Sequence, residues 1–385
     1  MKKRLSVILI GALVMVFALA GCGNGGSADK TDKKDSSNKK ISVVTTIFPE
    51  YDWTKEVLGE KAKDAEITML LDDGVDLHSY QPSAKDIEKI SSCDVFVYVG
   101  GESDEWVEDA LKEATNKDMQ VVNLMDTLGD KVKNEEVKEG MQTEEHHHHD
   151  GDKDDDDDHH DKHHDSDKDE DHDHDKDGDH DKDEHHDKDE DHDHDKDEHH
   201  HHDGDDPEKD EHVWLSLKSA QTCTTEIANA IGAVDKENKD TYLANAKAYN
   251  KKLANLDKEY SDAVKSASKK TLLFGDRFPF RYMVEDYKLD YFAAFVGCSA
   301  ESEASFKTIK FLANKMDQLG LKNVMTIENN DHKIAKTIIK NTNKKDQDIL
   351  TMDSMQSTTA KDVEKGATYL DIMTKNLKVL KKALQ

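Results

Sequence analysis

The sequence predicts an α/β protein with two lobes, each a mainly parallel β-sheet flanked by helices, joined by a long rigid linking helix and interrupted by a disordered His/Asp-rich insert. Two sets of short apolar runs alternate with helical patterns, which is typical of parallel sheets covered by helices. Between the two sets lies a helical pattern of roughly thirty residues, about 45 Å long at 1.5 Å per residue. The length of 385 residues is sufficient for two domains with cores of their own.

The chain opens with a targeting segment. Basic residues precede an apolar stretch at 5–20, which is short for a membrane span and typical of a signal peptide. The stretch leads into the sequence LAGC, which resembles a bacterial lipobox, so we expect Cys22 to become the first mature residue and to carry lipid. Residues 1–21 are therefore expected to form a lipoprotein signal peptide, and residues 22–40 a flexible lipid-anchored tether. A plain transmembrane anchor is the alternative.

The N-terminal α/β lobe is expected over 41–143. Its strands are expected at 41–46, 67–71, 95–99 and 120–124, and its helices at 51–58, 83–90 and 105–114. Ser83 followed by Asp86 has the spacing of a capping box, which predicts where the second of these helices begins.

The insert, residues 144–211, contains 36 acidic and 8 basic residues and almost no apolar ones. Because such a segment cannot form a core, we expect it to be disordered. The sequence DKDEDHDHDKD occurs in it twice, at 167–177 and 187–197, which indicates low complexity. The insert carries nearly all of the net charge of −31, so the rest of the chain is close to neutral and offers no basic surface to nucleic acid.

The segments after the insert complete both lobes. Residues 212–235 are assigned to the N-terminal lobe, with a helix capped by Ser216, and residues 236–268 to the linking helix. The C-terminal α/β lobe is expected over 269–385. Its strands are expected at 271–274, 291–295, 323–327 and 349–352, and its helices at 282–287, 305–319, 331–341 and 369–384.

Histidine is concentrated in the insert, which holds 19 of the 22 histidines mixed with carboxylates. Such a segment can hold Zn²⁺, Ni²⁺ or Cu²⁺ at weak, exchangeable sites, and its imidazoles disfavour Mg²⁺. We interpret it as an auxiliary metal loop, with a plain acidic linker or a calcium buffer as the alternative. Its histidines are His146, His147, His148, His149, His159, His160, His163, His164, His172, His174, His180, His185, His186, His192, His194, His199, His200, His201 and His202.

Two histidines outside the His-rich tract lie at the edges of predicted helices and strands. His78 follows the second strand, and ligands of open α/β sheets bind at the carboxyl ends of strands. His212 precedes the apolar run at 213–215, where the fold resumes after the insert. The alternatives are a solvated loop histidine for His78 and a last member of the tract for His212.

Three cysteines remain after the lipobox, at Cys93, Cys223 and Cys298. An odd number leaves at least one unpaired, and no C-x-x-C spacing indicates a thiolate zinc knuckle. We interpret these cysteines as structural, and a disulfide between two of them stays open.

Several of these segments together resemble the zinc/manganese-type solute-binding lipoproteins of metal ABC transporters, in particular the zinc-binding subgroup with a His-rich loop. GVDLHSYQPSAKDI resembles the first ligand segment of that family, and EHVWLS resembles the second. The resemblance covers residues 41–385 apart from the insert. It implies His78 and His212 as metal ligands, and the segment MDSM implies Asp353 as another, with an Asp that caps a turn as the alternative.

The sequence departs from the family at the remaining ligand position. The family has a His or Glu a few residues before a Tyr-rich helix, and here that position falls on Arg277, whose guanidinium stays protonated and cannot bind a metal. The adjacent Asp276 is the candidate replacement. Alternatively, Arg277 pairs with Asp276 or Asp353, and the pocket binds its ion with fewer protein ligands.

The resemblance implies capture and delivery of Zn²⁺, and the sequence contains no Walker, G-x-S-x-G or H-E-x-x-H motif that would indicate an enzyme. The expected partners are an ABC permease and its ATPase subunit, together with the bacterial cell membrane, to whose outer face Cys22 anchors a monomer. Mn²⁺ is the alternative cargo, because the loss of one imidazole leaves a site richer in carboxylate. A surface metal-storage or adhesion lipoprotein without a transport role is the alternative of another class.

Overall fold

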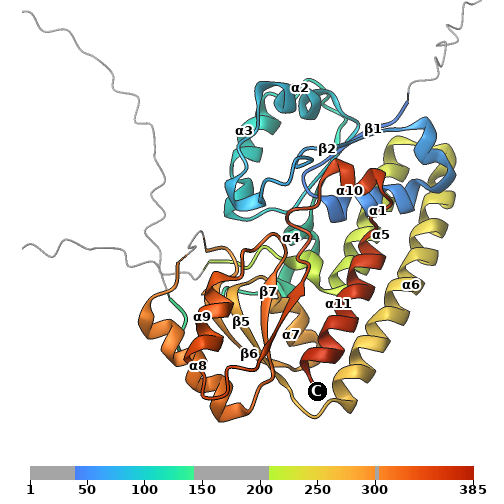
Figure 1. Ribbon diagram of the computed structural model, residues 1–385. Helices are drawn as coiled ribbons and strands as arrows, with labels where there is room; N and C mark the ends of the chain where they lie inside the picture. Colours follow the sequence, from blue (N-terminus) through green and yellow to red (C-terminus); the bar gives the residue numbers. More distant parts are fainter. Residues whose placement is uncertain (1–39, 143–207, 300–302) are drawn as a thin grey trace, which may run out of the picture. The chain divides into compact units, whose positions relative to one another are not determined.

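The computed structural model describes residues 40–142, 208–299 and 303–385, which form two lobes, each built on a four-stranded sheet (Figure 1). The signal peptide, the tether with Cys22 and the insert up to residue 207 lie outside the described residues, so the expectations for them stay predictions.

The sheet of the N-terminal lobe has the strand order β2-β1-β3-β4, and all of its pairings are parallel. Its strands are β1 Ser42–Thr45, β2 Glu66–Met69, β3 Val95–Tyr98 and β4 Gln120–Asn123. Each lies within two residues of its predicted ends. Val95, Phe96 and Val97 are fully buried in succession, as expected for a strand covered on both faces.

The helices of this lobe are α1 Phe48–Leu58, α2 Ala84–Ser92, α3 Trp106–Lys112, α4 Leu124–Leu128 and α5 Leu217–Val234. Two of them, α2 and α5, begin where their capping residues predict, whereas α1 begins three residues before its predicted start. The hydroxyl of Ser83 accepts from the backbone N–H of Asp86 while the Asp86 carboxylate accepts from that of Ser83, which confirms the capping box. The hydroxyl of Ser216 accepts from the N–H of Ser219 at 3.1 Å and caps α5. The short helix α4 was not predicted.

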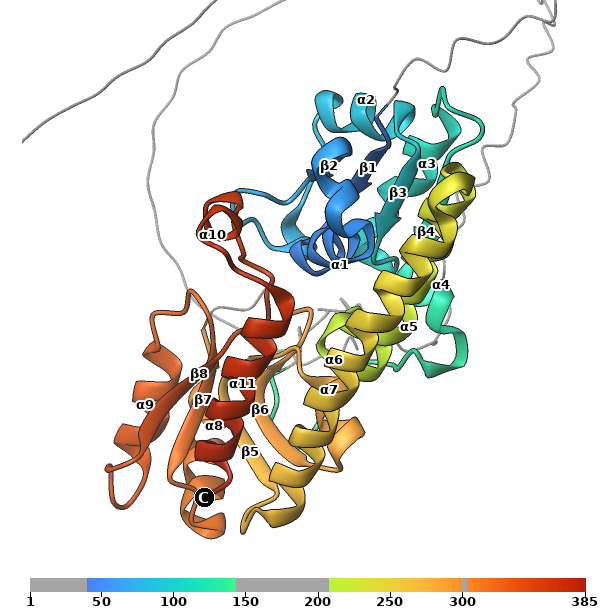
Figure 2. The same cartoon turned by 90° about the vertical axis from the view of Figure 1, so that its right-hand side faces the viewer.

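The linking helix is α6, Lys239–Ser266, whose 28 residues span about 42 Å. It packs against α1 and α5 of the N-terminal lobe and against α7 and α11 of the C-terminal lobe, so it runs along both (Figures 1 and 2). Its buried side chains recur every three or four residues, which confirms the predicted apolar stripe: Tyr242, Ala246, Tyr249, Leu253, Leu256, Tyr260 and Val264.

The sheet of the C-terminal lobe has the order β6-β5-β7-β8 and is also parallel. Its strands are β5 Thr271–Phe278, β6 Asp290–Val296, β7 Asn323–Ile327 and β8 Asp348–Met352. Its helices are α7 Arg281–Tyr287, α8 Phe306–Leu319, α9 Lys333–Asn341, α10 Ala360–Glu364 and α11 Tyr369–Ala383. The short α10 was not predicted.

Strand β5 is longer than the sequence predicts. The expected strand ended at residue 274, whereas β5 continues through Phe278, with a shift of register between Phe274 and Arg277. The polar residues of the extension are tolerated because the backbone N–H of Ile327 on β7 donates to the buried carboxylate of Asp276. Asp276 and Arg277 are therefore strand residues rather than loop residues.

One apolar cluster extends through both lobes, and a smaller second cluster lies under α8 and α9. The ring of Trp53 on α1 meets the ring of Tyr369 on α11 edge-on, with centroids 5.1 Å apart. The Tyr369 hydroxyl donates to the carbonyl of Trp214 at 2.6 Å. These buried contacts tie α1, α11 and the segment before α5 together.

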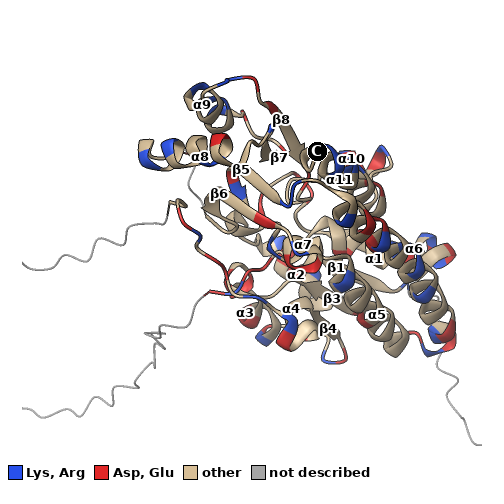
Figure 3. Cartoon of the chain, turned by 90° about the horizontal axis from the view of Figure 1, so that it is seen from below, with Lys and Arg blue, Asp and Glu red and all other residues tan. Residues whose placement is uncertain are grey.

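Basic and acidic residues are interspersed along the helices (Figure 3). No helix among the described residues is both long enough and apolar enough to cross a membrane.

Candidate metal site

His78 is held at the carboxyl-end side of the first sheet. It lies in a single 3-10 turn, Leu77–Ser79, after β2, and the Asp76 carboxylate accepts from the backbone N–H of His78 at 3.1 Å. Leu77 is buried, so the turn is anchored on the core while the His78 side chain remains 12% exposed. The sequence placed this residue correctly between the strand and the capped helix α2.

His212 lies immediately before the 3-10 turn Val213–Leu215, which leads into α5. Its side chain is fully buried. The neighbouring Trp214 is also buried, and its indole N–H donates to the carbonyl of Ser354 at 2.8 Å. The apolar residues after His212 therefore fix the backbone from which the imidazole projects.

Carboxylates orient both imidazoles. The Nδ1 atom of His212 lies 2.9 Å from Oδ1 of Asp210, and Nδ1 of His78 lies 2.8 Å from the hydroxyl of Ser103 and 3.3 Å from Oε2 of Glu211. An ionised carboxylate only accepts hydrogen bonds, so the proton of a neutral His212 belongs on Nδ1 and its lone pair on Nε2. At His78 the hydroxyl of Ser103 can donate or accept, and the negative charge of the Glu211 carboxylate favours the same tautomer.

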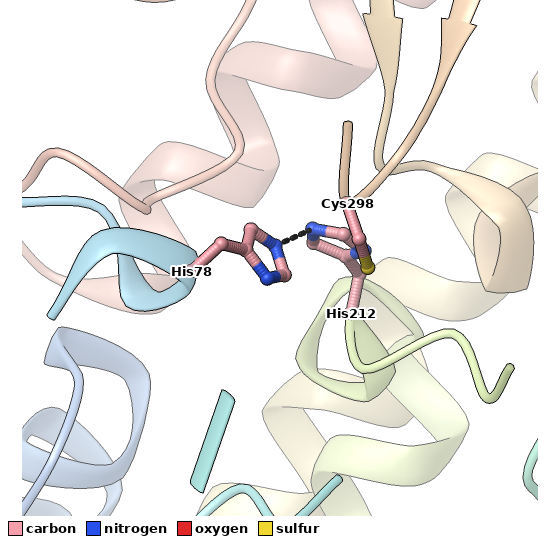
Figure 4. A group of neighbouring side chains, drawn as sticks. All are labelled: His78, His212 and Cys298. Atoms are coloured by element: carbon pink, nitrogen blue, oxygen red, sulfur yellow. Dashed lines mark hydrogen bonds between the residues drawn. The ribbon is translucent and has the colours of Figure 1, made fainter. Parts of the chain in front are cut away.

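The two Nε2 atoms face one another 3.2 Å apart (Figure 4). Two imidazole nitrogens bound to one tetrahedral Zn²⁺ at 2.0–2.1 Å lie about 3.3 Å apart. The observed separation is therefore close to that of a chelating pair. Without a proton or a cation between them, two facing lone pairs at this distance repel one another.

The Glu211 carboxylate can occupy its position because the neighbouring residue Gly101 has no side chain. Gly101 has a φ of +86°, and a Cβ there would collide with the Glu211 carboxylate. The backbone N–H of Ser103 donates to Oε1 of Glu211 at 2.8 Å. Burial raises the pKa of Glu211, but the contacts with His78 and Ser103 outweigh burial and hold that pKa below its ordinary value.

A third potential ligand is Cys298, in the loop after β6. Among the described residues, one group of potential metal ligands contains His78, His212 and Cys298, whose ligand atoms all lie within 4.8 Å of one another (Figure 4). The sequence interpretation of Cys298 as structural missed this placement. The available signal was its position just after a strand end, where ligands of such sheets bind.

The three cysteines of the described residues, Cys93, Cys223 and Cys298, carry no disulfide. Burial and the nearby Glu135 carboxylate raise the pKa of the Cys298 thiol, so the thiol is protonated while no cation is beside it.

Arg277 and Asp276 interact with residues other than the two histidines. Arg277 forms an ion pair with Asp76 rather than with Asp276 or Asp353. The Asp276 carboxylate accepts from the backbone N–H groups of Ile327 and Arg277, each at 3.0 Å. Among the described residues, Asp276 is not part of the group around His78 and His212.

Asp353 follows β8 and also lies outside that group. Its Oδ1 accepts from the backbone N–H of Met355 at 2.8 Å, as in a capped turn. It lines a neighbouring pocket of about 370 Å³ together with Glu328 and Asp362. Its role as a ligand stays a prediction.

Gln356, which the sequence gave no reason to single out, connects Asp76 to the histidine pair. In the amide orientation in which its nitrogen donates to the two Asp76 oxygens at 2.9 and 3.1 Å, its oxygen faces Nε2 of His212 at 3.3 Å, a contact that is a hydrogen bond only while Nε2 carries a proton. The space between the imidazoles is thus surrounded by electron-rich atoms.

Comparison with known proteins identifies the family to which the chain belongs. The family described as zinc-uptake complex component A, periplasmic, matches residues 43–383. The zinc-binding protein AdcA of Streptococcus pyogenes is 29% identical over 387 residues, covering 99% of this chain. The chain spans only 61% of the length of that relative. The high-affinity zinc uptake system protein ZnuA of Bacillus subtilis is 27% identical over 383 residues, covering 98% of that protein.

The fold has solved counterparts. The Zn(II)-bound ZnuA-like domain of Streptococcus pneumoniae AdcA superposes with a TM-score of 0.59 at 24% identity, covering 90% of this chain and 99% of that one. Since the family model extends from the first strand of the N-terminal lobe to the end of the last helix, this chain belongs to the family of periplasmic zinc-uptake components.

Proposed function

We propose that this protein captures Zn²⁺ between the imidazoles of His78 and His212 and delivers it to an ABC permease whose ATPase subunit drives uptake. The observation that carries the proposal is the pair of Nε2 atoms 3.2 Å apart, with both Nδ1 atoms beside carboxylates or a hydroxyl. The relatives named zinc-binding and zinc-uptake proteins support Zn²⁺ as the cargo. Mn²⁺ is the alternative cargo.

The electrostatics of the pocket favour a divalent cation. Asp210 and Glu211 are both buried and both lie against the histidine rings, so each contributes negative charge close to the ion. Arg277 is paired with Asp76, so its positive charge is compensated rather than directed at the histidines. A cation between the two Nε2 atoms replaces lone-pair repulsion with two coordinate bonds.

Asp353 and Asp276 remain our candidates for carboxylate ligands. Asp353 has one oxygen that accepts from the N–H of Met355, which leaves its other oxygen for an ion, and its recruitment requires the segment after β8 to move. Asp276 is less available because it is 6% exposed and each of its oxygens accepts a backbone hydrogen bond.

The His-rich insert is proposed to collect ions for this site. On its N-terminal side, the backbone N–H of Gln142 donates to the carbonyl of Ala294 on β6. On its C-terminal side, Asp210 contacts His212 directly. The described residues on the two sides of the insert are thus held on β6 and beside His212, and tethering raises the concentration of any ion that the insert holds near the histidine pair. The lipid on Cys22 is proposed to keep the protein on the outer face of the cell membrane.

The test is a competition titration with Zn²⁺ and a chelating dye on a variant whose residues 146–206 are replaced by a short Gly/Ser linker. We expect one tight site, and we expect His78→Ala and His212→Ala each to weaken it at least about 100-fold, because each removes one of the paired imidazoles. His332→Ala is the matched control, since His332 lies at the start of α9 outside the group. Tight binding that survives in the His78→Ala, His212→Ala double variant would refute the site.

A further inference from the structure

We propose that the thiolate of Cys298 is the third protein ligand of the captured ion, so that sulfur occupies the place left by the missing third imidazole. This inference rests on the proposed function, since it assigns a further donor to the same site. The donor set is then two imidazole nitrogens and one sulfur, with the fourth position left to a carboxylate such as Asp353 or to water.

The geometry brings the sulfur to the histidine pair from a separate element. His78 comes from the loop after β2, His212 from the turn before α5 and Cys298 from the loop after β6, so each reaches the site from a different segment (Figure 4). The three ligand atoms lie within 4.8 Å of one another. In a tetrahedral zinc site with Zn–S near 2.3 Å and Zn–N near 2.0 Å, sulfur and nitrogen lie about 3.6 Å apart. The Cys298 sulfur is therefore already close to the distance that a shared ion requires.

The residue before Cys298 permits this approach. A Cβ on Gly297 would lie 3.0 Å from Cε1 and 3.1 Å from Nδ1 of His212. The loop therefore passes directly against the His212 ring because residue 297 has no side chain. On the other side of the loop, the backbone N–H of Cys298 donates to Oε1 of Glu135 at 3.0 Å, which holds the cysteine at this position.

The other side chains at the expected third ligand position, Arg277 and Asp276, are less suited than Cys298 to bind the ion. Arg277 is a cation and is paired with Asp76. Asp276 has both oxygens bound to backbone N–H groups of β5 and β7. Cys298 is grouped with both histidines, and its thiol also contacts the Glu135 carboxylate.

The chemistry also fits the pocket. A coordinated thiol gives up its proton, which leaves for solvent as the Zn–S bond forms. One thiolate reduces the charge of the bound Zn²⁺ to a net +1, which the nearby carboxylates of Asp210 and Glu211 compensate. Thiolate is a soft ligand that favours Zn²⁺ over Mn²⁺, so Cys298 would also set the choice of cargo.

A zinc–sulfur bond gives a spectroscopic signal that metal bound to the His-rich insert does not produce. The insert has no cysteine. Cys93 and Cys223 are 2% and 0% exposed in the apolar core. Cys22 in the lipidated chain carries a thioether rather than a thiol. A zinc–thiolate signal from the full lipidated chain therefore reports on Cys298.

The experiment is zinc-edge X-ray absorption on the full lipidated chain loaded with one equivalent of Zn²⁺, repeated with Co²⁺ to look for a thiolate charge-transfer band. We expect a zinc–sulfur shell at about 2.3 Å beside the nitrogen shell. Cys298→Ser should abolish the sulfur shell and the cobalt band, and should weaken Zn²⁺ binding about tenfold to a hundredfold while lowering the preference for Zn²⁺ over Mn²⁺. Cys93→Ser is the matched control and should retain both signals.

The outcomes separate this inference from the proposed function. If the unmodified chain shows no sulfur shell while His78→Ala still weakens Zn²⁺ binding, the Cys298 assignment is wrong and the histidine site stands. If the sulfur shell persists in Cys298→Ser, another thiol binds the ion and the assignment is also wrong. If neither histidine substitution changes the binding of the first equivalent, the proposed function itself fails. The spectrum of the unmodified chain is decisive even where a cysteine variant folds poorly.

Discussion

At the scale of single residues, the chemistry of the site depends on which ring nitrogen of each histidine holds the proton. Asp210 makes two contacts with His212, accepting from its backbone N–H at 2.9 Å and lying 2.9 Å from its Nδ1. These contacts select the tautomer that leaves Nε2 free and keep the ring in a fixed orientation. At His78 the Ser103 hydroxyl lies 2.8 Å from Nδ1, and the Glu211 carboxylate 3.3 Å from Nδ1 favours a proton on that nitrogen.

Asp210→Asn is therefore expected to weaken Zn²⁺ binding about tenfold to a hundredfold, because the amide removes the negative charge that makes the imidazole a stronger donor. The measurement is a dye-competition titration of the insert-free variant. Asp118→Asn is the control, since Asp118 is exposed at the surface. Unchanged affinity in Asp210→Asn would show that this carboxylate does not tune the ligand.

At the scale of elements, α6 is the part that both lobes share. Its buried stripe packs on helices of both lobes, and the hydroxyl of Tyr260 donates to the carbonyl of Met373 on α11 at 2.6 Å. A helix held along most of its length resists bending, since bending would break apolar contacts on both lobes at once. Release of the ion is thus expected to involve the ligand loops more than a hinge in α6.

Leu253→Ala is expected to lower the free energy of unfolding by about 2–5 kcal/mol, because Leu253 is fully buried in the middle of this stripe and its truncation leaves a cavity. Urea unfolding of the metal-free protein measures the loss. Lys251→Ala, two residues away on the exposed side, should change stability little. A loss below about 1 kcal/mol for Leu253→Ala would mean that the core around α6 is loosely packed.

At the scale of the whole molecule, the lobes are joined through a buried carboxylate as well as through α6. Asp52 on α1 accepts from the backbone N–H of Tyr369, the first residue of α11, at 2.9 Å. Burial raises the pKa of Asp52 from 3.8 to about 6, although the hydrogen bond from Tyr369 lowers it in part. The folded protein thus holds this proton more tightly than the unfolded chain does.

Because the folded pKa of Asp52 is raised, its contribution to stability is full below about pH 4 and is lost as the pH rises through 6. Between pH 5 and pH 8 this group should cost the folded state about 1.4 kcal/mol. Asp52→Asn should remove that part of the pH dependence, as measured by urea unfolding at both pH values. Asp64→Asn, at an exposed position, is the control. An identical pH dependence in Asp52→Asn and the unmodified chain would contradict the raised pKa.

The sequence by itself determined most of the elements and singled out His78 and His212 as candidate ligands. Hydrophobic periodicity and caps such as Ser83 and Ser216 are local, so they predicted the helices and strands, including the linking helix, before any contact between lobes was known. His78 and His212 were found because each lies in a short segment with a distinctive pattern.

Only the tertiary structure decided how distant side chains meet. The 3.2 Å separation of the two Nε2 atoms, the pairing of Arg277 with Asp76 and the approach of Cys298 to the histidines all join segments far apart in the chain. No local pattern encodes such contacts, because they depend on how loops from three elements pack against one another. Asp276 and Asp353 show the same limit of sequence-based prediction. The sequence makes each a candidate ligand, but in the folded chain backbone N–H groups donate to both carboxylates, and no local pattern predicts those contacts.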